Sequence, residues 1–164
     1  MVRLEEELLE RLRSFEWRKF NVCHVILFGS LARRGEGNDI DLLLVPCSSR
    51  GSLDPDTLLD MYSSLSKHLG VDPTLLDLVD ASRAGCVLLI EAWRSGLIVY
   101  TVSRSKLLDY MLPRLSICED ELISVQRLGI VEAAVEAARR RWSSGGVGKA
   151  LHSNSRDDSE AGRA

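Results

Sequence analysis

The chain has 164 residues, 45% of them hydrophobic and 27% charged, and a formal net charge of −3 at pH 7. This length predicts one domain with a tail, and the apolar fraction excludes disorder throughout. The acidic balance argues against a protein built to coat nucleic acid. No apolar run in the sequence is long enough to cross a membrane, and the charged amphipathic start is not typical of a signal peptide. We therefore expect a cytoplasmic protein.

The first part of the chain combines a helical pattern with a short buried strand. Residues 3–19 carry apolar side chains at helical spacing and predict a first helix. The run 22–28 is apolar, rich in β-branched residues and too short for a helix, so it predicts a buried strand. Residues 31–34 are expected to begin a short helix, and Gly35 and Gly37 supply a turn after it.

A second strand is expected over residues 39–45, where Pro46 ends it. Strict alternation places Asp39, Asp41 and Leu43 on one face of this strand, and the intervening apolar residues on the other.

The rest of the chain continues the alternation of helices and strands. Asp54 is expected to cap a helix that starts at Pro55, and Gly70 is expected to end that helix. After it we expect a strand over 74–79, a helix over 87–94, a strand over 97–102, and helices over 105–115 and 119–142. This order predicts an α+β fold, with a small mixed β-sheet and helices packed mainly on one face.

Two aspartates stand two residues apart on the second strand. Residues i and i+2 of a strand point the same way, with Cα atoms roughly 6.6 Å apart. Asp39 and Asp41 can therefore converge on two cations held about 3.5–4 Å apart. Carboxylates are hard oxygen ligands of the kind that Mg²⁺ prefers, and two of them on one strand face repel each other unless a cation compensates.

A phosphate-binding turn is predicted directly before these aspartates. Gly29 has no Cβ, so a phosphate can approach its backbone closely. Ser30 offers a hydroxyl and an N–H group, and the start of a helix at residues 31–34 would present further N–H groups. Arg33 and Arg34 could add guanidinium contacts to phosphate oxygens.

These residues carry a family resemblance. Gly29-Ser30 followed by Asp39-Ile40-Asp41 resembles the signature of the DNA polymerase β-like nucleotidyltransferase superfamily. The longer string FGSLARRGEGNDIDLLLV is similar to the minimal nucleotidyltransferases, small prokaryotic proteins often encoded beside a HEPN-domain partner. The resemblance covers residues 20–102.

The superfamily uses a third carboxylate on a later strand, and Asp77 stands at the matching position. From the residues alone, Asp77 is an acid within an apolar strand, where a charge is costly unless something pairs with it. Asp80, at the end of the same strand, is interpreted as the N-cap of the following helix.

The resemblance implies that a nucleoside triphosphate, ATP in particular, would place its phosphates over Gly29 and Ser30. Two Mg²⁺ ions would be held by Asp39, Asp41 and Asp77. AMP would pass to a hydroxyl of a partner protein, a tyrosine on a HEPN toxin, and the chain would act as an antitoxin.

Two departures from the family pattern support an alternative. The loop between Ser30 and Asp39 is shorter than in most members, and Asn38 replaces the usual Ser or Thr. The alternative is a weakly active or inactive module of this fold that neutralises a toxin by binding alone. A third hypothesis, a tRNA- or antibiotic-modifying transferase, usually requires larger added domains.

The same resemblance suggests a division of the chain. We expect a nucleotidyltransferase catalytic domain over 1–102, C-terminal helices over 103–142 that pack on it or on a partner, and a disordered tail over 143–164. The apolar stripe over 122–135 is compatible with packing on the chain's own domain or on a partner helix, so the sequence does not exclude an oligomer. The arginines at 139–141 are interpreted as cations at a helix C-terminus.

The cysteines are widely spaced and form no CxxC pair, so a zinc site is not expected. Cys23 and Cys86 lie in apolar runs and are interpreted as small buried hydrophobes. The sequence does not exclude a disulfide, although one would be unusual in a cytosolic protein. His24, within the first strand, is interpreted as a packed or hydrogen-bonded core residue.

Overall fold

The computed structural model describes residues 1–127, 129, 133, 135–137, 139 and 140. The chain forms two units, Met1–Asp120 and Glu121–Ala164, and both sheets lie in the first. None of the helices in these described ranges combines the length and the apolar character that crossing a membrane would require.

The elements follow the predicted order, with four short additions. In chain order they are β1 (Val2–Arg3), α1 (Glu6–Ser14), the 3₁₀ helix η1 (Trp17–Phe20), β2 (Val22–Phe28), α2 (Gly29–Arg34), β3 (Glu36–Gly37), β4 (Ile40–Pro46), α3 (Pro55–Leu69), the 3₁₀ helix η2 (Pro73–Leu75), β5 (Leu76–Asp80), α4 (Cys86–Ser95), β6 (Leu97–Thr101) and α5 (Arg104–Arg127). The additions β1, η1, β3 and η2 have two to four residues each, too few to show a periodic pattern.

The main sheet has four strands in the order β5-β4-β2-β6. β2 runs antiparallel to β4 and β6, whereas β4 and β5 are parallel. The sheet is therefore mixed, as predicted, and β5 is an edge strand. A second, two-stranded sheet pairs β1 with β3.

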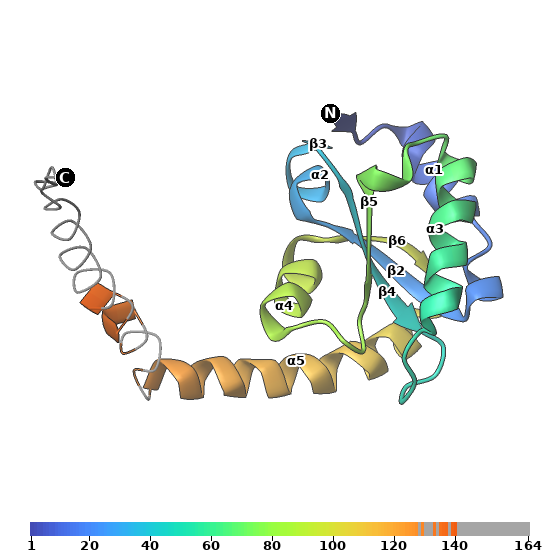
Figure 1. Ribbon diagram of the computed structural model, residues 1–164. Coiled ribbons are helices and arrows are strands. Elements are labelled where there is room, and N and C mark those ends of the chain that lie inside the picture. Colours follow the sequence, from blue (N-terminus) through green and yellow to red (C-terminus); the bar gives the residue numbers. More distant parts are fainter. Residues whose placement is uncertain (128, 130–132, 134, 138, 141–164) are drawn as a thin grey trace, which may run out of the picture. The chain divides into compact units, whose positions relative to one another are not determined.

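Helices cover both faces of the main sheet (Figure 1). One buried cluster joins α1, η1, α2 and α3 to the face that carries Ile40, Leu42 and Leu44. The other joins α4 and α5 to the opposite face, with Leu43 and Val45. The predicted α+β class and the alternation along β4 are confirmed. The helices, however, are divided between the two faces instead of lying mainly on one, because both faces of β2 and β4 are apolar and each needs a cover.

The caps of α3 are those expected from the sequence. The Asp54 side chain accepts a hydrogen bond from the Thr57 backbone N–H at 3.2 Å, and Pro55 is the first helical residue. At the other end Gly70 adopts φ 69° and donates its N–H to the Ser66 carbonyl. A left-handed residue of this kind is most easily glycine, so these two residues fix the length of α3.

The helix α5 passes through Pro113 and differs from the prediction because it runs without a break across residues 116–118. Two separate helices were expected, over 105–115 and 119–142. Buried residues lie on both sides of the proline, including Met111 and Cys118. This packing holds the helix together where one backbone hydrogen bond is lost. The predicted helix end at residue 142 and the tail over 143–164 lie outside the described residues.

The cysteines correct a second expectation. Cys23 is bonded to Cys47 and Cys86 to Cys118, with Cα atoms 4.8 and 5.1 Å apart. Cys23 and Cys86 are therefore not simply buried hydrophobes. The antiparallel pairing of β2 and β4 brings the start of one strand beside the end of the other, which sequence spacing alone does not show.

Candidate functional site

The turn between β2 and α2 requires glycine at its first position. Gly29 has φ +73°, and a Cβ built on it would lie 2.3 Å from the Asp41 Oδ2 atom. Any side chain here would therefore collide with the carboxylate as well as strain the backbone. The group that lies close to the Gly29 backbone in this structure is the Asp41 carboxylate; the approach of a phosphate to this turn stays a prediction.

Ser30 follows on α2, beside the loop that leads to the aspartates. A Cβ on Gly37 would lie 2.5 Å from Ser30 Oγ and 3.0 Å from the Leu31 backbone nitrogen. The N-terminal segment fixes this loop through the β1–β3 pairing and a 2.8 Å hydrogen bond from the Leu4 N–H to the Gly35 carbonyl. No described side chain caps the start of α2, so its first N–H groups are available to an anion.

The three predicted acids gather at one end of the main sheet. Asp41 and Asp77 are register partners in the parallel pair of β4 and β5, so their side chains leave the same face of the sheet side by side. Asp39 precedes β4 by one residue and is exposed, whereas Asp41 is half-buried. Strand alternation turns Asp39 toward the same face as Asp41.

The pKa of Asp41 reflects the closeness of these acids. Burial is the main cause that raises the pKa of its carboxyl group, and three neighbouring negative charges raise this pKa further. In decreasing order, these charges belong to Asp77, Asp39 and Glu91. The two acids predicted to act with Asp41 are thus close enough to repel it.

Asp77 is not buried, which corrects one step of the sequence argument. Its side chain is exposed because β5 is an edge strand. The cost of a buried charge therefore does not demand a cation at Asp77; proximity to Asp41 is the reason to place one there.

Asp80 has a structural role that differs from the predicted one. It is buried and accepts hydrogen bonds from the Leu53 N–H at 2.7 Å and from the N–H and hydroxyl of Ser82. It therefore caps the turn after β5, whereas Gly85 is the N-cap of α4.

The two arginines predicted to bind phosphate are both exposed, in the last turn of α2. Arg33 forms a 3.2 Å ion pair with Glu91 of α4. Glu91 was not singled out from the sequence, where it is one acid among many on a helix pattern. Its position shows only when α4 packs beside α2, and there it becomes the third carboxylate near Asp41.

The donor set suits a hard divalent cation, although the carboxylates are not drawn together around one. Among the described residues, no group of three or more His, Cys, Asp or Glu side chains lies close enough to hold a metal ion. The chemistry of the site still fits Mg²⁺, because crowded carboxylates raise the pKa of Asp41 and a cation at this place would relieve their repulsion.

No protein-family model matches the chain, and no curated protein matches it. Solved structures do match. One is a toxin–antitoxin structure with AMP-PNP, with a TM-score of 0.59 and 18% identity over 80% of this chain and 99% of that chain. Another is a tri-AMPylated Shewanella oneidensis HEPN toxin in complex with an MNT antitoxin, with a TM-score of 0.57 and 18% identity over 79% of this chain and 98% of that chain.

A third match is the MntA–HepT toxin–antitoxin complex, with a TM-score of 0.53 and 19% identity over 79% of this chain and 94% of that chain. At this level of identity the likeness shows the fold. The chain therefore shares the fold of these solved structures over about four-fifths of its length, which agrees with the α+β fold expected from the sequence.

Proposed function

We propose that this protein is a Mg²⁺-dependent nucleotidyltransferase that transfers AMP from ATP to a hydroxyl group of a partner protein. The observation that carries the proposal is the meeting of Asp41 with Gly29 on one side and Asp77 on the other. This meeting supports the proposal because it puts acidic side chains beside the start of α2, whose first N–H groups no described side chain caps.

Each of the site residues would have its own role. The N–H groups of Gly29 and Ser30 would bind the β- and γ-phosphates. Asp39 and Asp41 would hold two ions, with Asp77 completing the set on the side of the nucleophile. When bound, Mg²⁺ would neutralise the triphosphate and activate the acceptor hydroxyl.

Asp77 is exposed at the sheet edge, where an acceptor arriving from solvent can reach it. It would therefore be accessible to accept the hydroxyl proton on the side of the nucleophile. Most of the rate would come from positioning and charge neutralisation, as in other phosphoryl transfers.

The proposed partner is a HEPN-domain toxin, and the chain would be its antitoxin. This step rests on the solved complexes that share the fold, one of which contains a tri-AMPylated HEPN toxin and another AMP-PNP. A tyrosine of the toxin would be the acceptor, as the sequence resemblance implies.

The test is incubation of the purified chain with Mg²⁺ and each α-labelled nucleoside triphosphate, with and without a candidate HEPN-domain partner. We expect label from ATP on the partner, and none when the label is on the γ-phosphate. If the complex forms but no nucleotide labels either protein, the chain neutralises by contact and the transferase assignment is wrong.

A further inference from the structure

A cavity of about 290 Å³ lies beside the Cys23–Cys47 disulfide, where β2 begins and β4 ends. Its walls come from β2, β4, the loop after β4 and the first turns of α5. Its lining residues are Cys23, His24, Pro46, Cys47, Ser49, Lys106, Asp109 and Tyr110. The candidate nucleotide site lies at the other end of the same two strands, so this cavity is separate from it.

The two disulfides differ in how a solute can reach them. Cys47 is exposed and its partner Cys23 borders the cavity. In the other disulfide Cys118 is only 3% exposed and Cys86 is half-buried, and neither of them lines the cavity. A small reagent can therefore reach Cys47 directly, whereas Cys118 is covered by the packing of α5.

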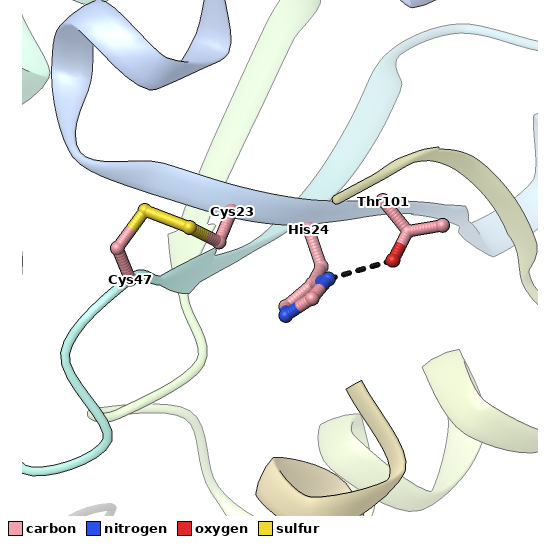
Figure 2. The surroundings of a disulfide bond; sticks show 4 residues. All are labelled: Cys23, His24, Cys47 and Thr101. Carbon is pink, nitrogen blue, oxygen red and sulfur yellow. Dashed lines mark hydrogen bonds between the residues drawn. A yellow bond between two sulfur atoms is a disulfide. The ribbon is translucent and has the colours of Figure 1, made fainter. Parts of the chain in front are cut away.

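One cation, one anion and a histidine line the cavity. Lys106 has no ion-pair partner within the described part of the chain, and it lines the same cavity as the disulfide. His24 hydrogen-bonds through Nδ1 to the Thr101 hydroxyl at 2.7 Å (Figure 2). Burial lowers the pKa of His24, and the nearby Lys106 charge lowers it further. Both effects favour the neutral imidazole. The positive charge at the cavity therefore comes from Lys106, and the negative charge comes from Asp109.

We propose that the Cys23–Cys47 disulfide is a thiol-exchange site, at which a small-molecule thiol such as glutathione enters the cavity and forms a mixed disulfide with Cys47. The incoming thiolate attacks the Cys47 sulfur and a new S–S bond forms between them. The Cys23–Cys47 bond breaks, and its electron pair leaves with the Cys23 sulfur as a thiolate. Lys106 stabilises that thiolate. A second thiol then releases Cys47 and is itself oxidised to the disulfide of the small molecule.

The experiment uses the native, full-length chain with reduced glutathione, followed by acid quenching, alkylation and peptide mass spectrometry. We expect adducts on Cys47 and free Cys23 to form about tenfold or more faster than any change at Cys86 or Cys118. Equal rates at the two disulfides, or faster opening of Cys86–Cys118, would overturn the proposal.

Charge variants test the role of the cavity itself. Lys106→Gln should slow exchange by about threefold or more, because the leaving thiolate loses its neighbouring cation, and Asp109→Asn should accelerate it. Lys67→Gln, an exposed lysine on α3, is the matched control and should leave the rate unchanged. Identical rates in all three variants would refute the assignment even if Cys47 reacts first.

Discussion

The two ends of the β2–β4 strand pair share one backbone arrangement and differ in chemistry. At one end Phe28 pairs with Asp41, and carboxylates gather beside a glycine turn. At the other end a disulfide joins Cys23 to Cys47. Burial and repulsion between carboxylates raise the pKa of Asp41 at the first end, whereas a covalent bond joins the strands at the second end. The fold therefore places its unbalanced charge where we propose that the substrate binds, and fixes the strands at the distant end.

The strongest local test of this contrast is Gly29→Ala. The new Cβ would meet Asp41 Oδ2 at 2.3 Å, and φ is +73°. We expect a loss of unfolding free energy on the order of 3–4 kcal/mol and a loss of AMP transfer of about a hundredfold or more. Denaturant unfolding and labelled-ATP transfer measure the two effects.

Gly35→Ala is the matched control for Gly29→Ala. Gly35 has a similar φ of +76°, but a Cβ there would meet nothing within 4 Å. Only backbone strain applies, so this variant should lose about 1–2 kcal/mol and keep most of its activity. Equal losses of activity in both variants would show that the contact between Gly29 and Asp41 does not matter.

The Cys23–Cys47 disulfide should contribute to the stability of the fold but not to catalysis. Replacing Cys23 and Cys47 together by serine opens a loop with a sequence separation of 24, which should cost about 3 kcal/mol. The melting temperature should then fall by roughly 6–12 °C. The rate of AMP transfer, measured well below the new melting temperature, should stay within about twofold of the wild-type rate. A large loss of rate would mean that the two ends are coupled.

Glu91→Gln should change the pH dependence of the carboxylate end. The negative charge of Glu91 helps to raise the pKa of Asp41. Without it this pKa falls, and Asp41 stays ionised to lower pH. The acid limb of the rate–pH profile should therefore move to lower pH, with about a two- to threefold higher rate on that limb. Glu10→Gln, on α1, serves as the control, and a profile that matches wild type in both variants would remove Glu91 from the site.

The smallest expected effect is on the thermal stability of the chain when no substrate is bound. The pKa of Asp41 is higher in the folded chain than its ordinary value of 3.8, so the folded state binds the proton more tightly. Stability from this group is thus lost as pH rises from that ordinary value through the folded pKa. Asp41→Asn should raise the melting temperature by about 1–2 °C at pH 7, and by less as pH falls toward 4. A lower melting temperature at pH 7 would contradict the repulsion argument.

Local patterns explain which features the sequence could predict. The strand over 22–28 was predicted with the bounds that β2 has, because a run of seven residues, all apolar except His24, ends at a glycine. The caps of α3 were read directly from Asp54 and Gly70. Asp41 and Asp77 could be matched as a pair because the family motif supplies the second strand, and the register of β4 with β5 agrees with it.

The features that were missed depend on contacts distant in the sequence. Glu91 reaches the site only because α4 packs beside α2. The disulfides depend on which strand ends and helices become neighbours, and cysteine spacing carries no information on that. The continuity of α5 across residues 116–118 likewise follows from packing, because Leu115 and Cys118 are both buried in one cluster, and tertiary contacts of this kind override local helix preference.

The most direct test of the central claim is the intact mass of the HEPN partner after co-expression with this chain. The account predicts that the partner gains the mass of one or more adenylyl groups with the wild-type chain. It predicts no gain with the Asp39→Asn, Asp41→Asn double variant, provided that the variant is folded and still binds the partner. An adenylylated partner in the presence of that double variant would contradict the assignment of these carboxylates.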